Sequence, residues 1–389
     1  MKKLNVALVG LGFGLEFVAI YCKHPDIDKV YVVDKNEKLL NIAKERYSIP
    51  DERCFTDLQD VLDIPEIDAV HLVTPPATHA PFSVRVLNAG KHCGCTIPMG
   101  MSIQELNDII AARKASGKNY MFMETTIFQR EFLYIQELYK KGEFGRLQYM
   151  TCAHYQDMEG WPEYWEGFPP LMHPTHAVAP CLMLAGHLPD KVYARGSGKI
   201  RKELADKYGC PFAFESAFIS LQDSDVTIEM ERFLYGVARN YSECFRVYGE
   251  NESFEWQQLN EENPVLFTRT GEFEKAEDIL DEDSEKSSRG TKIAENESRS
   301  RIMHTFFRRK SHPSPPTQYI TMRTPIFPSP REAVTVVPIH TLYMNSSVPF
   351  WKNVNLLLTT SWVLTGQYRI CAHESAMKGG EVITIPRFE

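Results

Sequence analysis

The stretch Val6-Ala7-Leu8-Val9-Gly10-Leu11-Gly12-Phe13-Gly14 leads from a continuous apolar run into three alternating glycines. Such a run is typical of a parallel strand covered on both faces, and the glycines allow a tight turn into a helix. Backbone N–H groups at the start of that helix would bind a pyrophosphate. A second apolar run ends at Asp34, where a carboxylate would accept hydrogen bonds from a ribose. The alternative is a glycine-tolerant turn with a surface aspartate. We predict a dinucleotide site at Gly10, Gly12, Phe13, Gly14 and Asp34.

The first 125 residues alternate strand-like and helix-like patterns. The apolar runs are 4–9, 30–33 and 69–73. Ser102 and Glu105 form a capping-box pattern, which predicts a helix that ends near Gly117. Strands that alternate with helices indicate βαβ units, so we expect residues 1–125 to form an α/β Rossmann domain with a parallel sheet.

From about Arg146 the pattern changes to strands with few helices between them. The expected strands are 147–154, 191–194, 212–221, 226–232 and 245–249. They predict an α+β domain, residues 126–270 and 339–389, built on a mostly antiparallel sheet whose open face could pair two copies. Residues 271–338 combine an acidic, serine-bearing run, a basic cluster and seven prolines. We expect a loop or partly disordered insert there, and a partner-docking tail is the less common explanation.

Composition and charge narrow the classes of function. The 389 residues include 43 Lys and Arg against 51 Asp and Glu, a net charge of −8, and 43% are hydrophobic. This composition is typical of a globular enzyme and unfavourable for binding a phosphate backbone. No stretch reaches the ~18 apolar residues of a membrane helix, and the nine cysteines are scattered. We therefore expect a cytoplasmic protein without nucleic-acid or membrane partners.

Further motifs follow the glycine-rich stretch in a fixed order. They are Asp34, Thr74-Pro75-Pro76-x-x-His79, Ala89-Gly90-Lys91-His92 and His176. Over roughly residues 1–265 and 351–389, this order resembles the Gfo/Idh/MocA-type oxidoreductases, the relatives of glucose-fructose oxidoreductase and inositol dehydrogenase. The resemblance implies a nicotinamide cofactor and chemistry at a sugar or cyclitol carbon. The expected cofactor contacts beyond the glycines and Asp34 are Thr74, Pro75, His79, Thr96 and Pro98.

Two positions depart from the family's pattern. Ile97 stands where the family places a lysine, and isoleucine can neither carry a charge nor donate a hydrogen bond. Met172 stands where the family places an aspartate, four residues before His176. We expect Ile97 to pack as an apolar wall against the cofactor or the sugar. Because of these two departures, a catalytically silent protein that senses NAD or a sugar is an alternative function.

Residues 154–165 are dense in aromatic and acidic side chains. Proteins bind sugars with aromatic faces against C–H surfaces and with carboxylates that accept hydroxyl protons. We therefore predict substrate contacts at Tyr155, Asp157, Trp161 and Trp165. The alternative is an aromatic corner that packs the two domains together.

A helix is predicted to begin at Pro174 and to end before Gly186. His173 and His176, three residues apart, share one side of its start. The resemblance implies that His176 is the acid/base near the nicotinamide, and we expect His173 to assist it. The two histidines together with His154 could instead bind a metal, although their spacing alone is not diagnostic.

We therefore predict an oxidoreductase that uses NAD rather than NADP and acts on a hydroxyl of a sugar or glycoside, with His176 as general base. Glu124 follows a predicted strand and either contacts the substrate or pairs with Arg130. An alternative function is an NAD-assisted glycosidase or lyase that oxidises its substrate transiently. A homo-oligomer through the second-domain sheet is expected.

Overall fold

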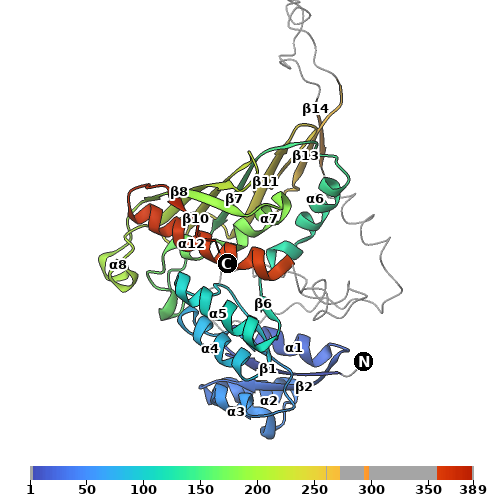
Figure 1. Ribbon diagram of the computed structural model, residues 1–389, viewed down its shortest axis with the longest axis vertical. Helices are drawn as coiled ribbons and strands as arrows, with labels where there is room; N and C mark the ends of the chain where they lie inside the picture. The colour runs from blue at the N-terminus through green and yellow to red at the C-terminus, as the bar shows by residue number, and fades with distance from the viewer. Residues whose placement is uncertain (1–2, 260, 272–292, 298–356, 388–389) are drawn as a thin grey trace, which may run out of the picture.

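The structure, a computed structural model, describes residues 3–259, 261–271, 293–297 and 357–387. Within these residues the chain forms a six-stranded and a nine-stranded β-sheet, with helices beside and between them (Figure 1). The six-stranded sheet is built entirely from the first 125 residues. An α/β Rossmann domain followed by an α+β domain is the predicted fold class, and it is confirmed.

All strands of the first sheet are parallel, in the order β3-β2-β1-β4-β5-β6. They are β1 (Leu4–Val9), β2 (Ile27–Val33), β3 (Cys54–Phe55), β4 (Ala69–Leu72), β5 (His92–Cys95) and β6 (Tyr120–Phe122). The connecting helices are α1 (Leu15–Lys23), α2 (Glu37–Tyr47), α3 (Leu58–Leu62), α4 (Pro76–Asn88) and α5 (Ile103–Ser116). The strand order reverses between β1 and β4. Ligands of such sheets bind at this reversal, outside the carboxyl ends of the strands.

The second sheet has the order β14-β13-β12-β11-β7-β10-β9-β8-β15 in the described residues, and only β7 and β10 pair in parallel. Its strands are β7 (Leu147–Tyr155), β8 (Pro189–Ser197), β9 (Phe214–Leu221), β10 (Thr227–Phe233), β11 (Ser242–Gly249), β12 (Glu252–Glu255), β13 (Val265–Arg269), β14 (Ile293–Glu297) and β15 (Ile383–Thr384). The α-helices that the structure describes after β6 are α6 (Arg130–Lys140), α7 (Thr175–Ala185), α8 (Lys202–Tyr208) and α12 (Leu357–Met377). The five strands predicted for this part of the chain correspond to β7–β11.

Two predicted helix boundaries follow their local signals. The side chain of Ser102 accepts a hydrogen bond from the N–H of Glu105 at 3.2 Å and caps α5, and Gly117 ends that helix with φ 63°. Gly186, with φ 69°, ends α7 in the same left-handed conformation. Helix α7 therefore ends where the sequence predicted, directly before Gly186.

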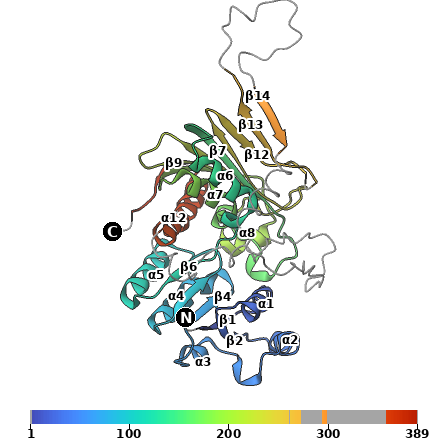
Figure 2. The ribbon, with the colours of Figure 1, turned by 90° about the vertical axis from the view of Figure 1, so that its right-hand side faces the viewer.

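Helix α12 lies between the two sheets in both ribbon views (Figures 1 and 2). It contacts β8 and β9 of the second sheet and also α5 and β6 of the first domain. It further contacts the short turn at Pro170–Met172, immediately before His173. The C-terminal helix therefore joins the first domain, the second sheet and the segment that precedes α7.

The predicted loop at 271–338 lies outside the described residues, apart from Gly271 and β14. Strand β14 corrects that prediction locally, because it pairs with β13 at an edge of the second sheet. Residues 339–356 of the expected second domain are also outside the described part. Among the described helices, none is both long and apolar enough to cross a membrane.

Candidate active site

The three glycines after β1 differ in what surrounds them. A Cβ on Gly10, whose φ is +92°, would overlap the carbonyl oxygen of Val73, and a Cβ on Gly14 would overlap that of Gly10. Gly12, in contrast, has nothing within 4 Å of the place a Cβ would occupy. The first and third glycines therefore serve close packing, and the second leaves open surface at the start of α1. This loop fits a dinucleotide pyrophosphate.

Asp34 connects the end of β2 to this glycine loop. Its Oδ2 accepts a hydrogen bond from the N–H of Leu11 at 2.6 Å, and its Oδ1 accepts one from Asn36 at 2.7 Å. A carboxylate oxygen has more than one lone pair, so both oxygens can still accept ribose hydroxyls. Phe13 stands beside the loop with 63% of its surface exposed.

His79 braces two loops at the carboxyl edge of the sheet. Its Nε2 lies 2.6 Å from the carbonyl oxygen of Thr74, and its Nδ1 lies 2.6 Å from that of Pro98. The residue is only 1% exposed. Thr96 donates to the carbonyl of Leu72 at 3.2 Å, from the same edge. The structure thus places these predicted residues together, with both nitrogens of His79 engaged by backbone.

Ile97 and Pro75 complete this edge of the first domain. Ile97 is 9% exposed and belongs to the main hydrophobic core, and Pro75 is exposed at the start of α4. Contact of either residue with a ligand stays a prediction. The lysine position of the family is therefore part of a buried apolar layer in this chain.

Glu124 and His176 form a hydrogen-bonded pair just after β6. Oε1 of Glu124 lies 2.7 Å from Nδ1 of His176 and also accepts hydrogen bonds from the N–H and Oγ1 of Thr126 at 2.9 and 3.0 Å. The Glu124 side chain is fully buried, whereas that of His176 is 18% exposed. The pair brings the start of α7 to the carboxyl edge of the first sheet. These contacts, rather than a pair with Arg130, are the partners that the structure gives Glu124.

Three neighbouring strands, β10, β7 and β11, each place one polar residue at the same register position, on strands that contact α7. His154 on β7 is paired in register with Arg232 on β10 and with Glu243 on β11. Oε1 of Glu243 lies 3.8 Å from Nε2 of His176. Tyr241 donates a hydrogen bond to Glu243, and its ring lies edge-on to His154 at 5.1 Å. Sequence reasoning did not identify Arg232, Tyr241 or Glu243.

Arg232 holds the segments that carry two of the histidines. Its guanidinium is 0% exposed and donates to the carbonyl oxygens of His173 and His154 at 2.9 and 3.1 Å, and to Oε1 of Gln156 at 3.0 Å. Burial lowers the pKa of Arg232 to about 9, against the opposing effects of Tyr241 and Glu243. A fixed donor set of this kind positions the backbone around His173 and His154.

The three histidines have different charge states. Burial, reinforced by Arg232 and the other histidines, holds the pKa values of His154 and His173 well below the ordinary value. Burial also lowers the pKa of His176, but the carboxylates of Glu124 and Glu243 outweigh it and raise that pKa to about 9. At neutral pH the cluster therefore carries one imidazolium, His176, beside two neutral rings.

The aromatic and acidic side chains of residues 154–165 lie in several different environments. Trp165 stacks on the ring of His173 at 4.9 Å and 28°, and Trp161 packs in a small apolar cluster nearby. Tyr155 follows His154 in β7 and so faces the opposite side of the sheet, where it donates to Glu231 at 2.6 Å. Asp157 is exposed and accepts from the N–H of Glu159. Of the four predicted substrate contacts, Trp165 is the one that touches a histidine of the cluster.

His154 is buried with neither ring nitrogen hydrogen-bonded among the described residues. Its ring centroid lies 5.6 Å from that of His176 and 6.1 Å from that of His173. In the described part of the chain, ligand atoms within 4.8 Å of one another occur instead at Cys210, Glu215 and His373. The three-histidine metal site considered from the sequence therefore does not form a compact ligand set.

Comparisons with known proteins also indicate an NAD-binding Rossmann domain in the first part of the chain. Residues 4–124 match the GFO_IDH_MocA family, described as an oxidoreductase family with an NAD-binding Rossmann fold. The match spans nearly the whole of the first domain. A levoglucosan dehydrogenase in complex with NADH shares the fold of this chain, with a TM-score of 0.70, 17% identity and full coverage of both chains.

Two curated relatives are named as glycoside-cleaving enzymes rather than as oxidoreductases. A glycosyl hydrolase family 109 protein from a Shewanella species and an alpha-N-acetylgalactosaminidase from Shewanella oneidensis are each 25% identical over 203 residues. The matched region covers 46% of this chain and 44% of each relative. The chain therefore matches less than half the length of these relatives.

We expect the first domain to prefer NAD to NADP. A 2′-phosphate on the ribose would bring negative charge to the carboxylate of Asp34, and the adjacent Lys35 would offset this repulsion only in part. Calorimetric titration of the purified protein with each dinucleotide measures the preference. Asp34→Asn should reduce it, with Asp57→Asn, a change in the cap of α3, as the control. Equal affinities of the native protein for NAD and NADP would contradict this prediction.

Proposed function

We propose that this protein is an NAD-dependent oxidoreductase that acts on a hydroxyl of a sugar or glycoside. The observation that carries the proposal is the Glu124–His176 pair, which holds a titratable imidazole at the carboxyl edge of the dinucleotide-binding sheet. NAD, when bound by Asp34 and the glycine loop, supplies the hydride acceptor. The residues of the chain then bind the sugar and move its hydroxyl proton.

His176 is the group that moves the proton. Glu124 accepts the hydrogen on Nδ1, so Nε2 is the nitrogen that faces a reacting hydroxyl. Neutral His176 takes the proton when the hydroxyl is oxidised, and the imidazolium returns it when a carbonyl is reduced. Trp165, stacked on His173, offers an apolar face for the sugar ring beside this position.

The raised pKa of His176 gives the two directions opposite pH dependences. Oxidation needs the neutral ring, so kcat/KM for oxidation should rise from neutral pH through the pKa of about 9. Reduction needs the imidazolium and should fall over the same interval. Initial rates in both directions across this range check the prediction. Two flat profiles would assign the proton transfer to another group.

A second function, an NAD-assisted glycosidase, is favoured by the names of the relatives that match part of the chain. Oxidation of one sugar carbon acidifies the hydrogen on its neighbour, so the aglycone can leave by elimination. Water then adds to the double bond, and reduction of the carbonyl by NADH returns NAD to its starting state. The Tyr241–Glu243 pair next to His176 provides further groups that can accept or donate a proton in such a cycle.

One experiment separates these functions. The purified protein is incubated with NAD and a panel of free sugars and aryl glycosides, while NADH absorbance and release of the aglycone are both recorded. NADH without aglycone supports the oxidoreductase, and aglycone without net NADH supports the glycosidase. If neither appears while the sugars still bind, the protein is a silent sensor.

The open face of the second sheet supports the proposal of a homo-oligomer. Phe218 and Tyr193 are paired in register on that face and are 43% and 38% exposed. Large exposed aromatic side chains are enriched where protein surfaces meet. Light scattering on Phe218→Glu against the native chain tests whether this face pairs two copies.

A further inference from the structure

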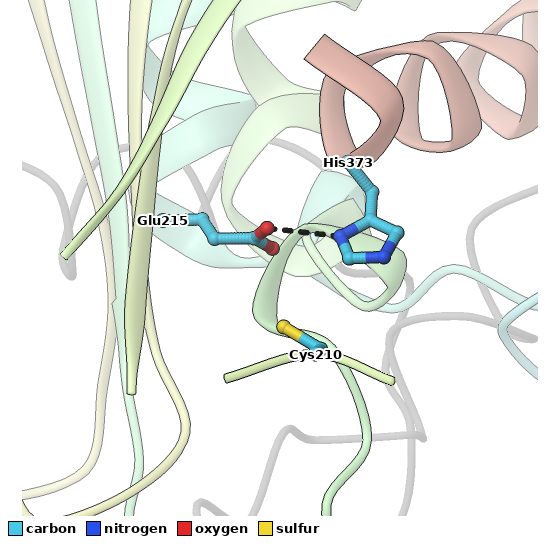
Figure 3. A group of neighbouring side chains, drawn as sticks. All are labelled: Cys210, Glu215 and His373. Carbon is cyan, nitrogen blue, oxygen red and sulfur yellow. Dashed lines mark hydrogen bonds and ion pairs between the residues drawn. The ribbon is translucent and has the colours of Figure 1, made fainter. Parts of the chain in front are cut away.

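Cys210, Glu215 and His373 form a second cluster of side chains that the proposed function does not use. Cys210 follows α8, Glu215 lies in β9, and His373 lies in α12. One sulfur, one carboxylate oxygen and one ring nitrogen from them lie within 4.8 Å of one another. Figure 3 shows the three side chains pointing toward one another from three separate segments. Each side chain is of a type that binds metals.

The cluster is enclosed on most sides. Cys210 is 0% exposed, the Glu215 side chain is also 0% exposed, and that of His373 is 18% exposed. Oε1 of Glu215 lies 2.9 Å from Nδ1 of His373. A buried carboxylate is costly unless a cation balances it, and a divalent ion would do so more completely than one imidazole.

The carboxylate is already held in a fixed direction. Oε2 of Glu215 accepts a hydrogen bond from the N–H of Leu171 at 2.7 Å, which leaves Oε1 to face His373. Hydrogen bonds of this kind orient ligating carboxylates in metal sites. Two of the three ligands therefore lie on regular elements, Glu215 on β9 and His373 on α12, and a backbone N–H also fixes the direction of Glu215.

The ligand types select a class of metal. A thiolate favours zinc and similar ions over Mg²⁺ and Ca²⁺, which prefer oxygen ligands. Around tetrahedral zinc the ligand atoms are about 3–4 Å apart, so this cluster needs only a small contraction to reach that geometry. We propose that Cys210, Glu215 and His373 bind a zinc-class divalent ion, with water as the fourth ligand on the exposed side of His373.

Metal binding displaces protons and one hydrogen bond from the three ligands. Cys210 releases its thiol proton to solvent as the sulfur–metal bond forms. Nδ1 of His373 gives up the proton that it shares with Glu215, so that the metal-bound ring is neutral with its remaining proton on Nε2, and one metal bond to each partner replaces the Glu215–His373 hydrogen bond. The ion then joins α12 to β9. Through Glu215 and Leu171 it also fixes the turn that precedes His173. It stabilises the scaffold and takes no part in proton transfer at His176.

Cobalt substitution of the full-length protein tests the site. The chain is stripped of metal with a chelator, reduced, and titrated with Co²⁺, whose bond to a thiolate gives a near-ultraviolet charge-transfer band. One equivalent should produce this band in the native chain. Cys210→Ser should abolish it and His373→Gln should weaken Co²⁺ binding at least tenfold. Cys22→Ser, a change at an exposed cysteine, is the matched control and should keep the band.

A second measurement uses only the native chain, so it does not depend on whether the variants fold. In the native chain, Zn²⁺ should raise Tm by several degrees whereas the same concentration of Mg²⁺ should not, because a ligand that binds only the folded state stabilises it. A native chain that gives no charge-transfer band, a band that survives in Cys210→Ser, or an unchanged Tm with Zn²⁺ would each overturn the proposal. The cluster would then be a hydrogen-bonded Glu215–His373 pair beside a structural thiol.

Discussion

Replacing His176 by asparagine should lower turnover by about 10²–10⁴-fold, the usual contribution of a positioned general base or acid. Asparagine keeps a polar group next to Glu124 but cannot take or return a proton at neutral pH. The loss should appear in kcat for both directions of the reaction. Initial rates with NAD and the best sugar found in the screen measure it.

The affinity for NAD should be nearly unchanged in His176→Asn, because the glycine loop and Asp34 are held by contacts that do not involve α7. His187→Asn, at a histidine between α7 and β8, is the matched control and should keep full activity. If His176→Asn were as active as the native chain, the proton transfer would have to be reassigned to His173 or Tyr241.

Glu124→Gln should change the pH dependence of the oxidation rate and leave the fold largely intact. The carboxylate of Glu124 is the principal cause of the raised pKa of His176, opposing the effect of burial. Glutamine retains an oxygen that can accept from His176 Nδ1 and Thr126 but removes the negative charge. The kinetic pKa for oxidation should therefore fall from about 9 by about 1–3 pH units.

The sign of this shift distinguishes an electrostatic role from a purely structural one. A raised pKa means that His176 stays protonated at neutral pH, so removing its partner should begin the rise in oxidation rate at lower pH. Glu243→Gln, which removes a carboxylate 3.8 Å away instead of 2.7 Å, should shift the profile in the same direction by less. A Glu124→Gln variant with the native kinetic pKa and a lower rate would show that Glu124 only supports the fold.

Much of the first domain could be predicted because its signals are local. The apolar run that ends at Gly10, the acid that ends β2 and the cap at Ser102 each involve neighbouring residues. The ends of α7 followed from Pro174 and Gly186 for the same reason. Strand β14 was not predicted, since a short polar segment such as 293–297 becomes a strand only by pairing with β13.

The polar centre beneath α7 depends on register between strands, which no local pattern gives. His154 is far in sequence from both Arg232 and Glu243, and it lies between them only because β7 pairs with β10 on one side and with β11 on the other. One signal was present in the sequence. In β10 the inward side chains are Ile228, Met230 and then Arg232, so a charged residue interrupts an apolar alternation. An inward charge at the end of a strand indicates a functional or bracing position.

The packing of α12 has a consequence for how the chain folds. Ser375 accepts a hydrogen bond from the N–H of Ala194 across 181 residues, and Arg369 donates to the carbonyl of Met172 across 197. Contacts that close such long loops form late and slowly, whereas the βαβ units of the first domain close short ones. During synthesis the dinucleotide-binding half can therefore assemble while the rest of the chain is still being made. The support beneath His173 is completed only after the residues of α12 have left the ribosome.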